Sequence, residues 1–308
     1  MAKLWEPNPD YQELKPQSLG NMPYKRLYGT PSQTQLRRLL QTAKGLHWQV
    51  LDLSTTGLEF LPEELGDLSD LKELNLSSSN LSSLPDSIGA LTNLQLLDLH
   101  NAPIQILPDS ICTLSNLKEL DLSVTQLRAL PEAIGALVNL QSLNLHNAPI
   151  QTLPDSVCDL ISLKRLNLSD SLLNALPDAI GNLTNLRILD LVATQINTLP
   201  DSIGNLVNLQ ELHIGGNEIR ELPDSIENLT SLQALYIRHG RLKNIPYSVI
   251  KLGLPFVTDD INADNCVNLT GVTLEEGDIS LFAQPREVIE AAYRGEKFTL
   301  RECKIIST

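Results

Sequence analysis

The sequence predicts an α/β solenoid, and three observations support this fold class. A 23-residue unit is written nine times without an insertion between residues 48 and 254 of the 308-residue chain. Each unit places a large apolar residue at the same seven positions. Within each unit, the apolar spacing changes from two residues to three and four residues. Self-similarity at a fixed period of this length is typical of units that stack along one axis.

The first part of each unit has the spacing of a β-strand. In the unit that begins at Leu117, Leu120 and Leu122 are two residues apart, and Asp121 lies between them. In an extended chain the two leucines point to one side and the aspartate points to the other. We therefore expect one short strand per unit, with its leucines in the core and its polar side chains on the face of the sheet that points away from the core.

The later part of each unit favours a short helical turn. After Leu130, the apolar residues Ile134 and Leu137 are four and three residues apart. Pro131 occupies the expected first helical position, where a missing amide donor costs little. Gly135 is expected to let the chain turn back, because glycine adopts conformations that other residues avoid. One such unit buries too little apolar surface to fold alone, so neighbouring units must cover each other.

The unit resembles the leucine-rich repeat, of the 23-residue kind with a Leu-Pro-x-x-Ile segment. This resemblance implies a right-handed curved superhelix, with a parallel β-sheet on its concave face and short helical or 3-10 turns on its convex face. Similar units occur in plant intracellular Ras-group leucine-rich-repeat proteins, in plant disease-resistance receptors and in effectors that bacterial pathogens inject into host cells. The family usually has Asn at the ninth place of the unit, but here this place holds Thr56, Ser79, Ala102, Thr125, Ala148, Ser171, Thr194, Asn217 and Gly240. We expect hydroxyls to replace part of an asparagine ladder, and Ala102 and Ala148 to contribute nothing to it.

The sequence divides into three regions. Residues 1–47 form an N-terminal segment with a capping helix, for which Thr30 is the predicted cap, Pro31 the first helical residue and Gly45 the end. A basic recognition helix is the alternative, since Arg37 and Lys44 lie on its polar side. Residues 48–254 form the nine repeats. Residues 255–308 form a C-terminal cap or a small extra element, with a helix expected over residues 285–294 and short strands within 271–279 and 298–306.

Composition limits the partners and the compartment. The net charge of −14, from 37 acidic and 23 basic residues, argues against nucleic acid and anionic membranes. It favours a protein partner with a basic or neutral contact surface. Cys112 and Cys158 occupy the same place two units apart, about 10 Å from each other, so they are predicted to be buried and unpaired. The start has no apolar signal core and no stretch is long enough to span a membrane, so we predict a monomeric, cytoplasmic protein.

The candidate binding residues are the outward-pointing side chains of the strands. The fifth place of the unit is mostly Asp or Asn, and its last two members are His213 and Tyr236. A solvated strand face is the plain interpretation, because the family often has Asp or Asn there. Like charges on neighbouring strands are unfavourable, however, and an unpaired acidic pair suits Lys or Arg of a partner. The predicted protein-binding residues are Asp98, His100, Asp121, His146, Asp190, His213, Tyr236, Arg238 and His239.

No motif indicates catalysis or a cofactor. His100, Asp121 and Ser123 fall near one another and superficially resemble a hydrolase triad, but no nucleophile turn or oxyanion hole accompanies them. Bacterial leucine-rich-repeat ubiquitin ligases carry a large catalytic domain after the repeats, with a Cys-x-Asp motif in one major class. Neither Cys266 nor Cys303 is followed by that pattern. We find no nucleotide-binding loop and no Cys/His set with metal-ligand spacing, and we predict neither a cofactor nor a metal.

The resulting hypothesis is a non-catalytic protein-interaction module that binds a host or cellular protein through its concave face. The favoured setting is a bacterial effector secreted into the cytosol of a host cell. One alternative is a ubiquitin-ligase-related effector or adaptor that acts through residues 255–308. Another is a plant-type intracellular signalling scaffold, and a third is a purely structural use of the solenoid.

Overall fold

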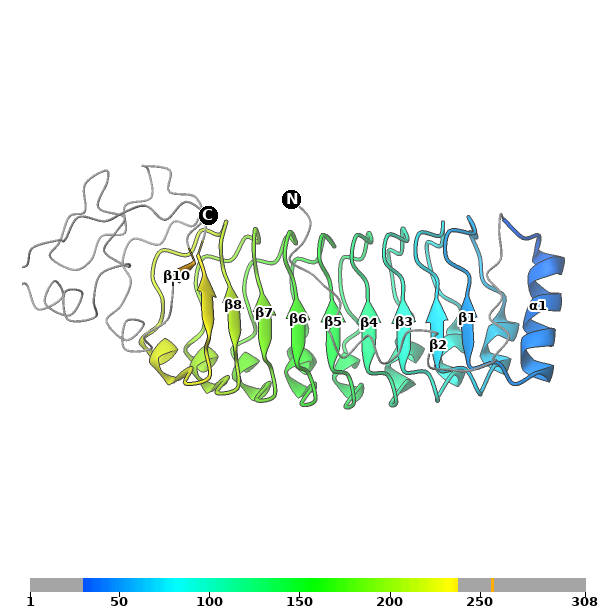
Figure 1. Ribbon diagram of the computed structural model, residues 1–308. Coiled ribbons are helices and arrows are strands. Elements are labelled where there is room, and N and C mark those ends of the chain that lie inside the picture. Colours follow the sequence, from blue (N-terminus) through cyan, green and yellow to red (C-terminus); the bar gives the residue numbers. More distant parts are fainter. Residues whose placement is uncertain (1–29, 238–255, 258–308) are drawn as a thin grey trace, which may run out of the picture.

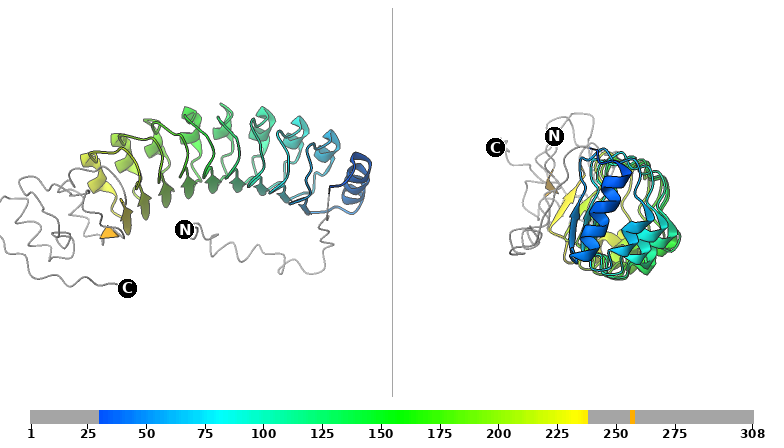
Figure 2. Two further views of the ribbon diagram at one scale, coloured as in Figure 1. Left: turned by 90° about the horizontal axis from the view of Figure 1, so that it is seen from above. Right: turned by 90° about the vertical axis from the view of Figure 1, so that its right-hand side faces the viewer.

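The computed structural model describes residues 30–237 and the backbone of 256–257, and these form one open, parallel sheet with a helix at its N-terminal end. The strands follow one another in sequence order (Figure 1). They lie on the inner side of a shallow arc, and the helical turns lie on its outer side (Figure 2). The strands are β1 Val50–Asp52, β2 Glu73–Asn75, β3 Leu96–Asp98, β4 Glu119–Asp121, β5 Ser142–Asn144, β6 Arg165–Asn167, β7 Ile188–Asp190, β8 Glu211–His213, β9 Ala234–Tyr236 and β10 Phe256–Val257.

This arrangement confirms the predicted α/β solenoid with one strand per unit. Equivalent residues of successive units pair directly, so that Leu74, Leu97 and Leu120 form one column. Every framework residue from Trp48 to Leu235 is at most 8% exposed, and together these residues build one continuous core. The strand β10 pairs with β9 and extends the sheet beyond the ninth unit, which the repeat pattern did not predict.

The outer face carries 3-10 helices, as expected for turns of this length. They are η2 Glu63–Asp67, η3 Asp86–Ala90, η4 Asp109–Thr113, η5 Ile134–Ala136, η6 Asp155–Asp159, η7 Ile180–Asn182, η8 Asp201–Asn205 and η9 Asp224–Asn228. In the five-residue turns the proline is the N-cap, with φ between −66° and −78°, and the first helical residue is acidic. The prediction that proline is the first helical residue was therefore wrong by one position in these turns, and Pro131 lies three positions before Ile134, the first residue of η5. The proline at each of these N-caps has an extended backbone conformation, so the 3-10 helix begins only at the residue after it.

The helix α1, Gln33–Gly45, covers the N-terminal end of the core. The predicted cap Thr30 is wrong: the N-cap is Ser32, because Ser32 and Gln35 form a reciprocal capping box at distances of 2.9 and 3.3 Å. Leu36, Leu40 and Ala43 are buried against the first unit. The helix ends at Gly45, as predicted.

The basic side of α1 faces the acidic turn of the first repeat. Arg37 lies 3.2 Å from Glu64, and Lys44 lies 3.0 Å from Asp67. These contacts orient the helix over the end of the core. They favour the capping interpretation over the recognition-helix alternative, because two of its basic side chains already have partners within the chain.

The glycines of the outer turns have a different role from the predicted one. Gly135 is not among the residues with positive φ, so it does not turn the chain by a left-handed conformation. A Cβ atom on Gly135 would lie 2.3 Å from the carbonyl oxygen of Ser156 in the next unit. Glycine is needed here because two stacked turns approach closely.

The left-handed conformation instead occurs at the eighth place of each unit, just after the strand. There φ lies between 52° and 71° in every described unit. Asn, Asp, Ser and Gly hold most of these places, but Val124 has φ of 57°. A β-branched side chain is strained in this region of φ and ψ.

Replacing Val124 with asparagine is therefore expected to raise the free energy of unfolding by about 1 kcal/mol. Asn101 and Asn147 adopt this conformation in neighbouring units, with φ of 55° and 52°. The shift in the urea midpoint measures the effect. The reverse change, Asn147→Val, should cost a similar amount, and stabilisation by both substitutions would contradict the explanation.

Groups at the ninth place of the unit, after the strand, donate hydrogen bonds to main-chain carbonyls. At the ninth place, the hydroxyls of Thr56 and Thr125 donate to the carbonyls of Leu53 and Leu122 at 2.6 and 2.7 Å. This bears out the expectation that hydroxyls replace part of an asparagine ladder. At the ninth-place alanines the main chain takes this role, since the amides of Ala102 and Ala148 donate to the carbonyls three residues earlier, both at 3.1 Å.

A second ladder lies at the last place of the unit, which sequence inspection had not singled out. Five asparagine side chains each donate through Nδ2 to a main-chain carbonyl 24 residues earlier, all at 2.8 Å. The ladder therefore joins five units to the ones before them, and Ser162 and Ser231 interrupt it. The donors are Asn93, Asn116, Asn139, Asn185 and Asn208.

Candidate protein-binding surface

The strand face, defined as the outward side chains of β1–β9, is held by side chains that cap the main chain. In seven successive units the Asp or Asn at the end of the strand accepts, through Oδ1, the amide N–H two residues later, at 2.8–3.1 Å. This Asx turn explains why the fifth place holds Asp or Asn in these seven units. It does not require a charge, because both residues have the accepting oxygen. The negative charges of Asp98, Asp121 and Asp190 are thus additional to the structural role.

Asp98 and Asp121 face each other on neighbouring strands, as the repeat spacing predicts. They are register partners in β3 and β4, and both are half-buried. Each uses Oδ1 for its Asx turn. Asp121 also accepts the side-chain amide of Asn144 at 3.1 Å. Two like charges at about 5 Å on adjacent strands repel each other.

His100 joins this pair through Ser123, which is 3% exposed. The imidazole Nδ1 lies 2.8 Å from the hydroxyl oxygen of Ser123, and that hydroxyl donates to Asp121 Oδ1 in a short hydrogen bond. Because the serine proton points to Asp121, Nδ1 of His100 is the donor in its own contact. A nucleophilic serine would need to give its proton to the histidine instead. The order of the three groups therefore differs from that of a hydrolase triad.

The same arrangement recurs two units later. His146 lies 3.0 Å from the hydroxyl of Ser169, which donates to Asn167 Oδ1 at 2.6 Å. Here an amide replaces the carboxylate of the first copy. The strand face thus has two histidine sites of similar geometry. At the second site His146 also lies 3.5 Å from Asp170.

The C-terminal end of the strand face is aromatic. His213, which is buried, lies 3.1 Å from Glu211, and its ring centroid is 4.1 Å from that of Tyr236. Asp190 is the register partner of His213 on β7. Three predicted site residues, Asp190, His213 and Tyr236, therefore meet at this end. The predicted residues at positions 238 and 239 lie outside the described residues.

Burial raises the pKa of four carboxyl groups on the strand face. It is the main cause for Asp98, where the amide of His100 opposes the increase and the charge of Asp121 adds to it. Burial likewise raises the pKa of Glu73, Glu119 and Asp190. Such carboxyl groups keep their protons to higher pH in the folded chain than in the unfolded chain. The folded state therefore binds more protons, and the free energy of unfolding falls as the pH rises above the ordinary carboxyl pKa of about 4.

The Asp98→Asn substitution tests this linkage without breaking the Asx turn. We expect it to raise the free energy of unfolding at pH 7 by about 0.5–1 kcal/mol, because it removes a like-charge contact. At pH 3 the aspartate is protonated and neutral, so the two proteins should be equally stable. Urea unfolding at pH 3, 5 and 7 measures the difference. An equal gain at all three pH values would show that charge is not the cause.

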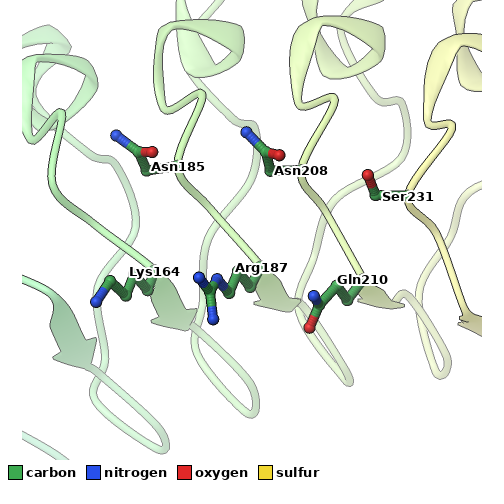
Figure 3. Close-up of a pocket in the computed structure, with 6 residues that line it drawn as sticks. All are labelled: Lys164, Asn185, Arg187, Asn208, Gln210 and Ser231. Carbon is green, nitrogen blue, oxygen red and sulfur yellow. The ribbon is translucent and has the colours of Figure 1, made fainter.

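The side of the sheet at the N-terminal ends of the strands is basic, and the prediction from the sequence missed it. We call this side the basic edge. The second place of the unit, just before each strand, holds Lys72, Lys118, Lys164 and Arg187 among glutamines. Only the fifth and seventh places were considered from the sequence, and inspection of the second place would have found this edge. A cavity of about 250 Å³ lies there, as shown in Figure 3, and its lining residues are Lys164, Asn185, Arg187, Asn208, Gln210 and Ser231.

Within residues 30–237, no group of three His, Cys, Asp or Glu side chains is placed to hold a metal ion. No helix in this part of the chain combines the length and the apolar character needed to cross a bilayer. Cys112 and Cys158 are buried and unpaired, as predicted, and burial raises the pKa of the Cys158 thiol to about 11.

The stacked 23-residue units, their leucine core and the exposed strand face define a repeat solenoid of the leucine-rich class. A family model for the leucine-rich repeat region matches residues 38–123, 109–187 and 155–240, which together exceed half of the chain. The chain belongs to the leucine-rich repeat family. No curated protein matches the chain significantly.

Solved structures of this class resemble the chain closely in fold. A leucine-rich-repeat protein of Leptospira interrogans is 29% identical with a TM-score of 0.62, over 77% of this chain and 67% of that one. The ectodomain of the Arabidopsis thaliana receptor kinase GASSHO1/SCHENGEN3, in complex with CASPARIAN STRIP INTEGRITY FACTOR 2, is 28% identical with a TM-score of 0.62, over 75% of this chain and 28% of that one. The plant peptide hormone receptor RGFR1, in complex with RGF2, is 26% identical with a TM-score of 0.59, over 71% and 41%. This chain thus spans less than half of either plant chain.

Proposed function

We propose that the protein is a non-catalytic interaction module that binds a segment of another protein along its strand face. One observation carries the proposal: the Asp98–Asp121 pair keeps two negative charges side by side although the Asx turns need only neutral oxygens. Asn144 and Asn167 fill the same structural role two units later without a charge. A lysine or arginine of a partner would relieve the repulsion of the two carboxylates.

Two further observations support a protein partner. The rings of Tyr236 and His213 are in contact at one end of the strand face, with their planes tilted by 37°, and aromatic side chains often dominate binding energy at interfaces. The structures that resemble this chain include plant receptors in complex with CASPARIAN STRIP INTEGRITY FACTOR 2 and RGF2. The proposal includes no catalytic step. The Ser123 hydroxyl donates to Asp121 and not to His100, which supports a non-catalytic function.

The experiment compares two variants that change charge equally on opposite faces. A library of displayed polypeptides is selected against the wild-type protein, and the affinity of the selected binders is measured. The double variant Asp98→Asn, Asp121→Asn should bind at least tenfold more weakly, about 1.4 kcal/mol or more. The control Asp86→Asn, Asp109→Asn alters exposed acids of the outer turns and should change affinity less than twofold. Equal losses in both variants, or no binder at all, would refute the proposal.

The setting we propose is a bacterial effector that acts as a monomer in the cytosol of a host cell. Its support is the resemblance to effectors built from bare repeats and the likeness to the Leptospira interrogans protein. A translocation reporter fused to the chain should give a signal in host cells only when the secretion system of the bacterium is intact. A signal that is independent of secretion, or none, would leave the binding function and remove the effector setting.

A further inference from the structure

The basic edge of the sheet has one irregular place. Along the second position of the units, glutamine and lysine alternate until Lys164 is followed directly by Arg187. Lys118 and Lys164 each donate through Nζ to the glutamine of the preceding unit, at 3.1 and 2.9 Å. The column in order is Gln49, Lys72, Gln95, Lys118, Gln141, Lys164, Arg187, Gln210 and Gln233.

Lys164 and Arg187 are therefore adjacent cations. The amide of Arg187 donates to the carbonyl of Lys164 at 2.8 Å, which places the two residues on neighbouring chain segments about 5 Å apart. Neither forms an ion pair with a carboxylate of the described chain, although Lys164 has its glutamine contact. Two positive charges at this distance repel each other, and an anion between them would relieve the repulsion.

The asparagine ladder is interrupted at the cavity, as it also is at Ser162. Asn185 and Asn208 donate to carbonyls of the preceding units, but the next member of the column is Ser231. Its side chain is too short to continue the ladder to the carbonyl of Val207, the equivalent acceptor. A cavity of about 250 Å³ lies beside Asn208 and Ser231, and both cations and Gln210 also line it (Figure 3).

We propose that this cavity binds the side-chain carboxylate of an aspartate or glutamate in the partner segment. Arg187 offers a planar set of N–H donors that fits a carboxylate, and Lys164 adds a second positive charge. The amide of Gln210 and the hydroxyl of Ser231 are further donors at the cavity wall. The inference rests on the proposed function and deepens it: the partner segment places an acidic residue at the basic edge and a basic residue at the Asp98–Asp121 pair.

The test uses random peptides joined to their carrier through the C-terminus, so that only side chains supply carboxylates. Peptides selected by the wild-type protein should be enriched in Asp or Glu, and changing that residue to its amide should weaken binding at least tenfold. Arg187→Gln should cause a loss of the same size. Lys118→Gln is the control, because it removes a cation of the same column outside the cavity, and it should change affinity less than twofold.

Ser231→Asn gives a second measurement that separates loss of binding from loss of folding. The new side chain should fill the cavity and donate to the Val207 carbonyl, so this variant should bind at least tenfold more weakly and yet unfold at a higher urea concentration. Peptides without acids, or equal losses for Arg187→Gln and Lys118→Gln, would overturn the inference. A second library presents peptides with a free C-terminus. Binding by peptides of that library alone would also overturn the inference.

The outcomes also distinguish this inference from the proposed function. Peptides that lose affinity with Asp98→Asn, Asp121→Asn but not with Arg187→Gln would leave the strand face as the binding surface and reject the carboxylate site. If neither variant affects any selected peptide, both proposals fail.

Discussion

Replacing Asn217 with alanine is expected to lower the free energy of unfolding by about 3–5 kcal/mol. The side chain is 2% exposed and joins two units. Its Nδ2 donates to the carbonyls of Leu191 and Ile214 at 2.8 and 3.0 Å, and its Oδ1 accepts the amide and the hydroxyl of Thr194, both at 2.8 Å. Alanine would leave several buried groups without partners, and each such group costs about 1–3 kcal/mol.

Thr125→Ala is the matched control at the same place of another unit. Its hydroxyl makes a single hydrogen bond, to the carbonyl of Leu122. The amides of Ala102 and Ala148 show how an alanine unit satisfies the equivalent carbonyl through the main chain. We therefore expect a loss of about 1 kcal/mol or less for Thr125→Ala. Urea unfolding of both variants measures the difference, and equal losses would show that the contacts of Asn217 between units contribute little.

Replacing Gly135 with cysteine is expected to destabilise the protein by about 2 kcal/mol, because a Cβ would overlap the carbonyl oxygen of Ser156. Cysteine nevertheless occupies this nineteenth place in two other units, as Cys112 and Cys158. The turns that follow them, η5 and η7, have three residues instead of five. In those turns the place of the serine is taken by Ala133 or Ala179.

In this chain, cysteine at the nineteenth place occurs together with alanine in the next turn, which suggests how the stability lost in Gly135→Cys can be recovered. Gly135→Cys combined with Ser156→Ala reproduces the combination seen at Cys112 and Ala133. The double variant should recover at least half of the stability that Gly135→Cys loses, as measured by the urea midpoint. A double variant no more stable than the single one would show that the shorter turns have another cause.

Much of the fold follows from local regularities that the sequence displays directly. The period of 23 residues, the strand spacing at Leu120 and Leu122 and the Leu-Pro-x-x-Ile segment predicted the solenoid, its parallel sheet and its outer turns. Two errors are local, at the Thr30 cap and at the prolines of the turns, and the third concerns a contact between units. Gly135 was assigned to a change of chain direction, whereas the structure assigns it to close packing against Ser156. Such an approach joins residues 21 positions apart, and no local pattern reveals its distance.

The candidate surface was predicted in part. The repeat register placed Asp98 opposite Asp121, and the structure agrees. The sequence did not reveal that the strand-end aspartates cap the main chain, because an Asx turn depends on backbone angles after the strand. It also did not reveal the direction of the Ser123 hydroxyl or the cavity beside Ser231.

The amino-acid sequence alone determines a leucine core, one strand in every 23 residues and a strand face of polar side chains, because these depend on spacing within a single unit. The stack of units settles the rest. It brings Lys164 beside Arg187 at the basic edge and His100 beside Ser123 on the strand face. These neighbours are 23 residues apart, and their chemistry arises from the approximately 5 Å separation that parallel pairing imposes.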